Sequence, residues 1–347
     1  MKRLLLAIIL VSAVFFVSNC GKKSEILGSF KESSKFTLNS PLRFANIKEF
    51  NGDFIAIDWA KPELFIFNNA GEVISSFNKV GKGPGELGQF GVDLIGTVGN
   101  TIYLSDRFAN KIMIYSYDAS KKSIAFSDEF PINDGRVNAA AIGDDGLLYC
   151  NVDAKDFQYF VFDAKGTLVK KLVPKKPAAA DAPIADSILY GMRYEIKHKN
   201  GIYSAGYMDY KLNFYVNGKD GELTAAFQGL PKYVFNKENF KVDTTNNSFS
   251  LSGSPGITGI FLLNDSLIFM VLADNNDENV FIQSYNAKGE YEGKYLLDGV
   301  GEKTNFYIVG CNGKDTLYYM VAPEDNDKTV RTTSEIVVAK LQSTTKP

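Results

Sequence analysis

The 347-residue chain has a single histidine, a single tryptophan, only three cysteines and no excess of basic charge. One histidine excludes a metal site built from several imidazoles, and a Ser-His-Asp triad would depend on His198 alone. A formal net charge of −2 provides no basic surface for a phosphate backbone, so we expect no nucleic-acid partner. With 45% hydrophobic and 22% charged residues, the composition is that of a folded globular protein.

The N-terminus carries an apolar run over residues 4–17, preceded by Lys2 and Arg3 and followed by Ser18, Asn19 and Cys20. This order resembles a bacterial lipoprotein signal, which predicts removal of residues 1–19, a lipid on Cys20 and a tether over residues 20–35. An ordinary secretory signal with a coincidental cysteine, or an uncleaved anchor, is the alternative. We expect a cell-envelope protein held to the membrane by its lipid alone. Gly21 after the cysteine favours the outer membrane.

A short apolar strand recurs with a period near fifty residues, at 54–58, 102–106, 148–152, 202–205, 267–270 and 317–320. In three units a second, aromatic strand ends in Asn or Asp, with a glycine four residues past the aromatic, at Gly71, Gly166 and Gly289. Six such units predict an all-β fold, a six-bladed β-propeller of four-stranded antiparallel blades over residues 36–342. We expect residues 36–44 to close the ring on the last blade.

Residues 54–71, the segment GKGPGELGQF at 81–90 and residues 102–115 resemble NHL-type repeats. Together with the lipoprotein signal, they make the chain similar to the six-bladed β-propeller lipoproteins, a family of TolB-like propellers. The resemblance implies the propeller fold. It leaves the activity open, because such propellers include binders, scaffolds and some enzymes.

Two other features receive structural interpretations. The glycine-rich segment 81–90 lacks the Gly-Lys-Ser/Thr ending and the following helix of a phosphate-binding loop, so we expect a tight connection between blades. Cys150 and Cys311 fall in the third and sixth units, on opposite sides of the expected ring. A disulfide needs Cα atoms within about 7 Å, so both cysteines are predicted to be reduced and buried.

The candidate ligand site lies at one mouth of the central channel, where the loops between second and third strands meet the connections between blades. Arginines beside aromatic residues suit carboxylates, sugars or peptide segments. The predicted ligand-binding residues are Asp58, Trp59, Asp106, Arg107, Arg136, Arg193 and Tyr210. The alternative is structural, with Asp58 and Asp106 fixing turns at strand ends and Arg107 in an ion pair.

The preferred function is a monomeric, lipid-anchored binding module for a protein or glycan partner, with no cofactor and no catalysis, because no nucleophile–base pair emerges. The alternative is a calcium-dependent hydrolase similar to the propeller lactonases. Its candidate calcium ligands are Asp274 and Asp277, in an oxygen-rich segment of the fifth unit. A scaffold without a specific ligand is the third possibility.

Overall fold

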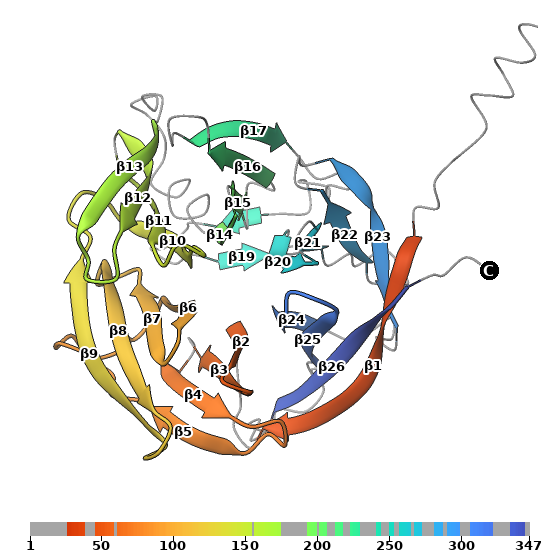
Figure 1. Cartoon of the computed structure of the whole chain (residues 1–347), viewed down its shortest axis with the longest axis horizontal. Helices are drawn as coiled ribbons and strands as arrows, with labels where there is room; N and C mark the ends of the chain where they lie inside the picture. Colours follow the sequence, from red (N-terminus) through yellow and green to blue (C-terminus); the bar gives the residue numbers. More distant parts are fainter. Residues whose placement is uncertain are drawn as a thin grey trace, which may run out of the picture.

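The computed structural model is an all-β ring whose blades surround a central axis (Figure 1). It describes residues 26–38, 46–58, 61–154, 156–174, 193–199, 201–206, 212–217, 223–229, 241–243, 250–252, 257–264, 267–272, 281–286, 290–298, 306–321 and 334–343. Among these residues, no helix is long and apolar enough to span a membrane.

Each blade is an antiparallel sheet whose strands follow one another outward from the axis (Figure 1). Blade 1 contains β2 (Asn46–Phe50), β3 (Asp53–Asp58), β4 (Glu63–Phe67) and β5 (Val73–Phe77). Blade 2 contains β6 (Val92–Val98), β7 (Thr101–Asp106), β8 (Lys111–Asp118) and β9 (Ser123–Pro131). Blade 3 contains β10 (Val137–Ile142), β11 (Leu148–Val152), β12 (Phe157–Phe162) and β13 (Leu168–Pro174).

The second half of the ring repeats this plan. Blade 4 contains β14 (Arg193–His198), β15 (Gly201–Gly206), β16 (Leu212–Asn217) and β17 (Leu223–Gly229). Blade 5 contains β20 (Ile257–Leu263), β21 (Leu267–Leu272), β22 (Phe281–Tyr285) and β23 (Tyr291–Leu297). Blade 6 contains β24 (Phe306–Cys311), β25 (Thr316–Val321), β26 (Ser334–Ser343) and, as its outer strand, β1 (Ile26–Leu38). The prediction of a six-bladed propeller is confirmed.

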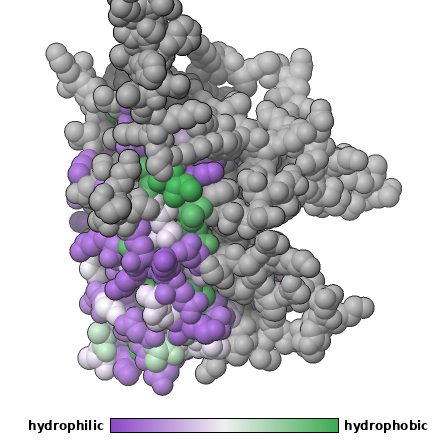
Figure 2. Space-filling model, turned by 90° about the vertical axis from the view of Figure 1, so that its right-hand side faces the viewer, coloured by the Kyte–Doolittle hydropathy of each residue, from purple (hydrophilic) through white to green (hydrophobic). Residues whose placement is uncertain are grey.

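Ring closure differs in detail from the prediction. The closing strand is β1, which pairs antiparallel with β26 and, through its first residues, parallel with β23 of blade 5. Residues 26–35, which we assigned to the tether, therefore lie in this strand. The strand has no recognisable apolar pattern, because residues 31–35 are all exposed and polar. Phe30, Phe36 and Leu38 are buried in the core, and the partly buried Leu27 packs against it. The side of the ring at the right of Figure 1 is largely hydrophilic over its described residues, apart from one hydrophobic strip (Figure 2).

The recurring apolar segments are the second strands of the blades, as expected. Those of blades 1 to 3 are buried on both faces, because each blade packs between two neighbours. Two of the three predicted glycine turns form, with φ of +79° at Gly71 and +80° at Gly166, and Gly289 lies outside the described residues. In both turns the preceding Asn68 or Asp163 accepts backbone N–H bonds through its side chain, which fixes the link to the outer strand.

Apolar residues fill the wedges between neighbouring blades. The wedge between blades 6 and 1 contains Phe36, Phe54 and Tyr318, and the wedge between blades 1 and 2 contains Ile55 and Tyr115. Cys150 is buried in blade 3 and Cys311 half-buried in blade 6, and both are free. Between β17 and β20, the described residues include a short hairpin, β18 (Lys241–Asp243) with β19 (Ser250–Ser252).

Candidate functional site

The two faces of the ring differ in which loops they carry. We call the face with the loops between second and third strands, and with the connections between blades, the mouth face. We call the face with the hairpin turns joining first to second and third to fourth strands the hairpin face.

Strand register places the predicted residues together, because the end of each second strand pairs with the start of the first strand in blades 1 to 4. Asp58, Asp106, Arg107 and Arg136 therefore all lie at the mouth face.

Asp106 shapes the loop that follows β7. The side chain is buried, and its Oδ1 accepts hydrogen bonds from the backbone N–H groups of Phe108 (3.0 Å) and Ala109 (2.8 Å). Asp58 has the corresponding place in blade 1, where its Oδ1 accepts from the N–H of Lys61 at 3.2 Å. Both aspartates thus hold strand-end turns, and Asp106 fixes the position of Phe108.

Arg107 forms an ion pair with Asp93 at the start of β6, with 2.6 Å between Nη2 and Oδ2. Asp93 pairs in register with Ser105, so Ser105 and the guanidinium lie on the same side of blade 2. Within the described part of the chain, the buried Ser105 Oγ and Arg107 Nε have no hydrogen-bond partner. These buried polar atoms are left unsatisfied just below the mouth face of blade 2.

Two exposed phenylalanines beside this ion pair were not predicted. Phe108 is 78% exposed and Phe90 is 56% exposed. Their loops lie side by side, because the N–H of Arg107 donates to the carbonyl of Gly91 at 3.0 Å. A Cβ on Gly91 would come 2.7 Å from the Phe108 ring, so glycine at φ +73° allows the ring to rest there. The available sequence signal was the aromatic residue two places after the strand-ending Asp106.

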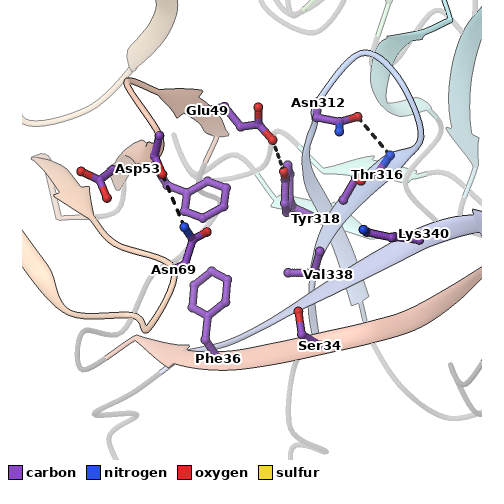
Figure 3. A pocket seen from close by; sticks show the side chains of 12 residues that line it. Ser34, Phe36, Glu49, Asp53, Asn69, Asn312, Thr316, Tyr318, Val338 and Lys340 are labelled. Atoms are coloured by element: carbon purple, nitrogen blue, oxygen red, sulfur yellow. Dashed lines mark hydrogen bonds between the residues drawn. The ribbon is translucent and has the colours of Figure 1, made fainter.

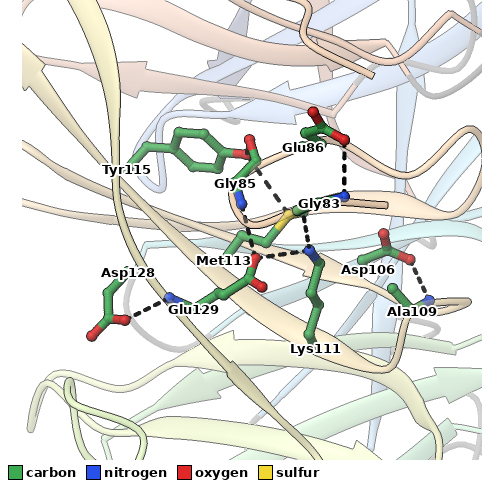
Figure 4. A network of polar contacts seen from close by, with 10 residues as sticks. All are labelled: Gly83, Gly85, Glu86, Asp106, Ala109, Lys111, Met113, Tyr115, Asp128 and Glu129. Atoms are coloured by element: carbon green, nitrogen blue, oxygen red, sulfur yellow. Dashed lines mark hydrogen bonds and ion pairs between the residues drawn. The ribbon is translucent and has the colours of Figure 1, made fainter. Parts of the chain in front are cut away.

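The glycine-rich segment 81–90 is a connection between blades 1 and 2, as predicted, and it is tied to blade 2 by polar contacts (Figure 4). The N–H of Gly85 donates to Glu129 Oε2 at 3.0 Å, and Lys111 Nζ pairs with the same oxygen at 2.8 Å. The Tyr115 hydroxyl donates to the Gly85 carbonyl at 3.1 Å. Within the segment, Glu86 accepts from the N–H of Gly83 at 2.8 Å. The segment therefore sets the position of Phe90 at its end.

The other predicted site residues are only partly covered by the structure. The carbonyl of Arg136 accepts from the N–H of Asp153 at 2.7 Å, which links the first strand of blade 3 to the second. The N–H of Arg107 makes the equivalent link in blade 2. Arg193 begins β14, and only its backbone is described. Trp59, Tyr210, Asp274, Asp277 and the lipidation candidate Cys20 lie outside the described residues. Among the residues that are described, no group of three or more His, Cys, Asp or Glu side chains is arranged to hold a metal ion.

Solved structures with a similar fold come from proteins of several kinds. An exported protein of Bacteroides fragilis matches with a TM-score of 0.55 and 17% identity, over 90% of this chain and 96% of the other. Regucalcin of Agrobacterium tumefaciens, a calcium-binding protein, matches with a TM-score of 0.52 and 12% identity, over 92% and 97%. The PQQ-bound aldose sugar dehydrogenase of Streptomyces coelicolor matches with a TM-score of 0.50 and 12% identity, over 91% and 98%.

At these identities the similarity extends to the fold alone. No curated protein sequence matches the chain. Residues 40–228 match the family model of the six-bladed beta-propellers, which covers more than half of the sequence. With its ring of four-stranded blades, the chain belongs to this six-bladed beta-propeller family.

Proposed function

We propose that this propeller is a lipid-anchored binding module of the bacterial envelope, and that it binds a protein partner on the mouth face of blade 2. The observation that carries the proposal is the pair of exposed rings, Phe90 and Phe108, on adjacent loops beside the Arg107–Asp93 ion pair. Aromatic side chains, phenylalanine among them, and arginine are enriched in the cores of protein interfaces.

The position of the N-terminal strand favours the mouth face over the hairpin face. Ile26 starts β1 beside the end of β26, where the N–H of Leu341 donates to the carbonyl of Asp315 in the β24–β25 turn. The chain therefore enters the ring at the hairpin face. Five residues lie between Cys20 and Ile26, and the six steps of chain span at most about 20 Å. A lipid on Cys20 would hold the hairpin face nearest to the bilayer and leave the mouth face open to the periplasm or exterior.

The rigid support of the two rings also suits a docking surface. Phe108 follows an aspartate that fixes its loop, and Phe90 ends a segment bonded to Lys111, Tyr115 and Glu129 through its glycines. Because these loops are held by blade 2, binding requires little ordering of the chain, which preserves affinity.

Cross-linking in intact envelopes, followed by purification of the propeller, tests this function. The double variant Phe90→Ala/Phe108→Ala should lose the partner that wild type captures. The matched control, Val73→Ala/Val98→Ala, removes two exposed apolar side chains from the hairpin side of blades 1 and 2 and should retain it. Thermal melting of both variants shows whether the ring is intact. Equal capture by wild type and the phenylalanine variant, or loss only in the valine control, would contradict the proposal.

A further inference from the structure

A recess lies on the hairpin face, at the seam where the ring closes between blades 6 and 1 (Figure 3). We call it the seam pocket; its volume is about 350 Å³, within the usual range for small-molecule sites. Strands β1, β2, β3, β25 and β26 and three hairpin turns contribute to it. Its lining residues are Ser34, Phe36, Glu49, Gly52, Asp53, Phe54, Asn69, Asn312, Thr316, Tyr318, Val338 and Lys340.

The floor of the seam pocket is aromatic and rigid. Phe54 stacks on Phe36 with 5.7 Å between ring centroids and meets the edge of Tyr318 at 5.1 Å. All three side chains are at most 9% exposed, so core packing fixes their orientation. Only narrow ring edges are exposed, so an apolar ligand face that covers them would bury a small area without ordering new side chains.

The rim carries polar groups of several kinds. Glu49 lies above the floor and accepts the hydroxyl proton of Tyr318, so its carboxylate is held toward the pocket (Figure 3). The exposed ammonium group of Lys340 approaches from β26 on the opposite side. Asn69 is positioned by a hydrogen bond from its Nδ2 to the carbonyl of Gly52 at 3.4 Å, which leaves its Oδ1 on the rim.

A register shift in β1 adds a further polar group. The pairing of β1 with β26 is irregular between Glu32 and Ser34, where the Ser33 hydroxyl donates to the carbonyl of Val338 at 3.0 Å. Bulges of this kind re-aim the neighbouring side chain. Ser34, on the far side of the shift, contributes its hydroxyl to the seam pocket (Figure 3).

We propose that the seam pocket binds a pyranose sugar. A pyranose has a ring of hydroxyl groups, which suits the polar rim, and one apolar face, which would cover the narrow exposed edges of Phe36, Phe54 and Tyr318. The carboxylate of Glu49 accepts from those hydroxyls, and the ammonium of Lys340 donates to them. The site is separate from the protein-docking surface, because it occupies the opposite face and a different pair of blades. On this face the sugar could come from a soluble saccharide or from a membrane glycolipid, and both present the same ring.

Calorimetric titration of the full-length protein in detergent tests the site. The soluble probes are the methyl glycosides of glucose, galactose and N-acetylglucosamine, and the membrane probe is monoglucosyl diacylglycerol in micelles of the same detergent, with glycolipid-free micelles as the blank. We expect binding of at least one probe, weakened about 10- to 100-fold by Glu49→Gln or Lys340→Gln, as when a hydrogen bond to a charged group is lost. Glu32→Gln on β1 and Lys165→Gln on blade 3 are exposed controls outside the pocket and should bind as wild type does.

The melting temperature gives a second measurement. Because the ligand contacts β1, β26 and blade 1 together, a bound sugar should raise the melting temperature of wild type and of both controls. It should leave Glu49→Gln and Lys340→Gln unshifted, although both must melt cooperatively to count as folded. Absence of binding by every probe, or equal binding by the rim variants and the controls, would overturn the proposal. Loss of the protein partner in the phenylalanine variant would not affect this result.

Discussion

Arg107 Nη2 lies 2.6 Å from Asp93 Oδ2, an ion pair that joins the end of β7 to the start of β6 at the mouth of the channel. The arginine side chain is 25% exposed and the aspartate side chain 34% exposed, so solvent screens the attraction. We predict a coupling energy below about 1 kcal/mol in a double-mutant cycle of Arg107→Ala and Asp93→Ala, followed by urea unfolding. A coupling above about 2 kcal/mol would show that the pair holds the ring together.

Glu195 links blade 4 to blade 3 through a buried polar network. Its carboxylate accepts from Asn151 Nδ2 (2.8 Å), Ser204 Oγ (2.8 Å) and the Tyr159 hydroxyl (2.9 Å). Because the three donors are buried, Glu195→Ala should lower the free energy of unfolding by about 2–5 kcal/mol. Tyr159→Phe removes one donor and leaves the other two satisfied, and should cost only about 1 kcal/mol. Equal effects of the two variants would argue against a shared network.

Lys48 makes stability depend on pH in the alkaline range. Its Nζ donates to the carbonyl of Ile95 in blade 2 at 2.7 Å, and burial lowers the pKa of Lys48 from 10.5 to about 8. Between these values the unfolded chain binds more protons than the native protein, so stability should rise from pH 8 to about 10. Lys48→Met should lack this rise. The tyrosines whose pKa values are raised are present in both wild type and Lys48→Met, so their titration affects the stability of both proteins equally. Parallel pH profiles of wild type and Lys48→Met would contradict the assignment.

The reactivity of the cysteine thiols tests both the burial of Cys150 and Cys311 and the processing of the N-terminus at Cys20. Burial raises the pKa of Cys150 to about 12 and that of Cys311 to about 12, which keeps both thiols protonated at neutral pH. Native protein should therefore react slowly with a thiol reagent. After denaturation, a chain with a lipid on Cys20 should titrate two thiols and an unprocessed chain all three. No free thiol in denatured protein would contradict the reduced state of Cys150 and Cys311.

The sequence predicts the ring well because its signals are local. A second strand buried between two blades must be largely apolar, as at 54–58 and 102–106, and a turn with positive φ needs glycine at positions such as Gly71. The closing strand β1 does not show this pattern, because residues 31–35 are polar and exposed. Its partners β23 and β26 also lie far along the chain.

The candidate sites depend on contacts that no local pattern reveals. Asp106 and Arg107 could be placed at the mouth from strand order, but the position of the Phe108 ring depends on Gly91 in another loop. In the seam pocket, Glu49 and Tyr318 meet across 269 positions of the sequence. Such pairs follow from the closure of the ring, which brings the first and last blades together.

Photocrosslinking from single positions in living cells tests most directly whether the mouth face of blade 2 is the binding surface. A photoreactive phenylalanine analogue would replace either Phe108, at the mouth, or Val98, exposed at the hairpin end of the same blade. We predict a discrete cross-linked protein from position 108 and none of the same mass from position 98. A product of equal yield from both positions, or only from position 98, would contradict a binding surface at Phe108.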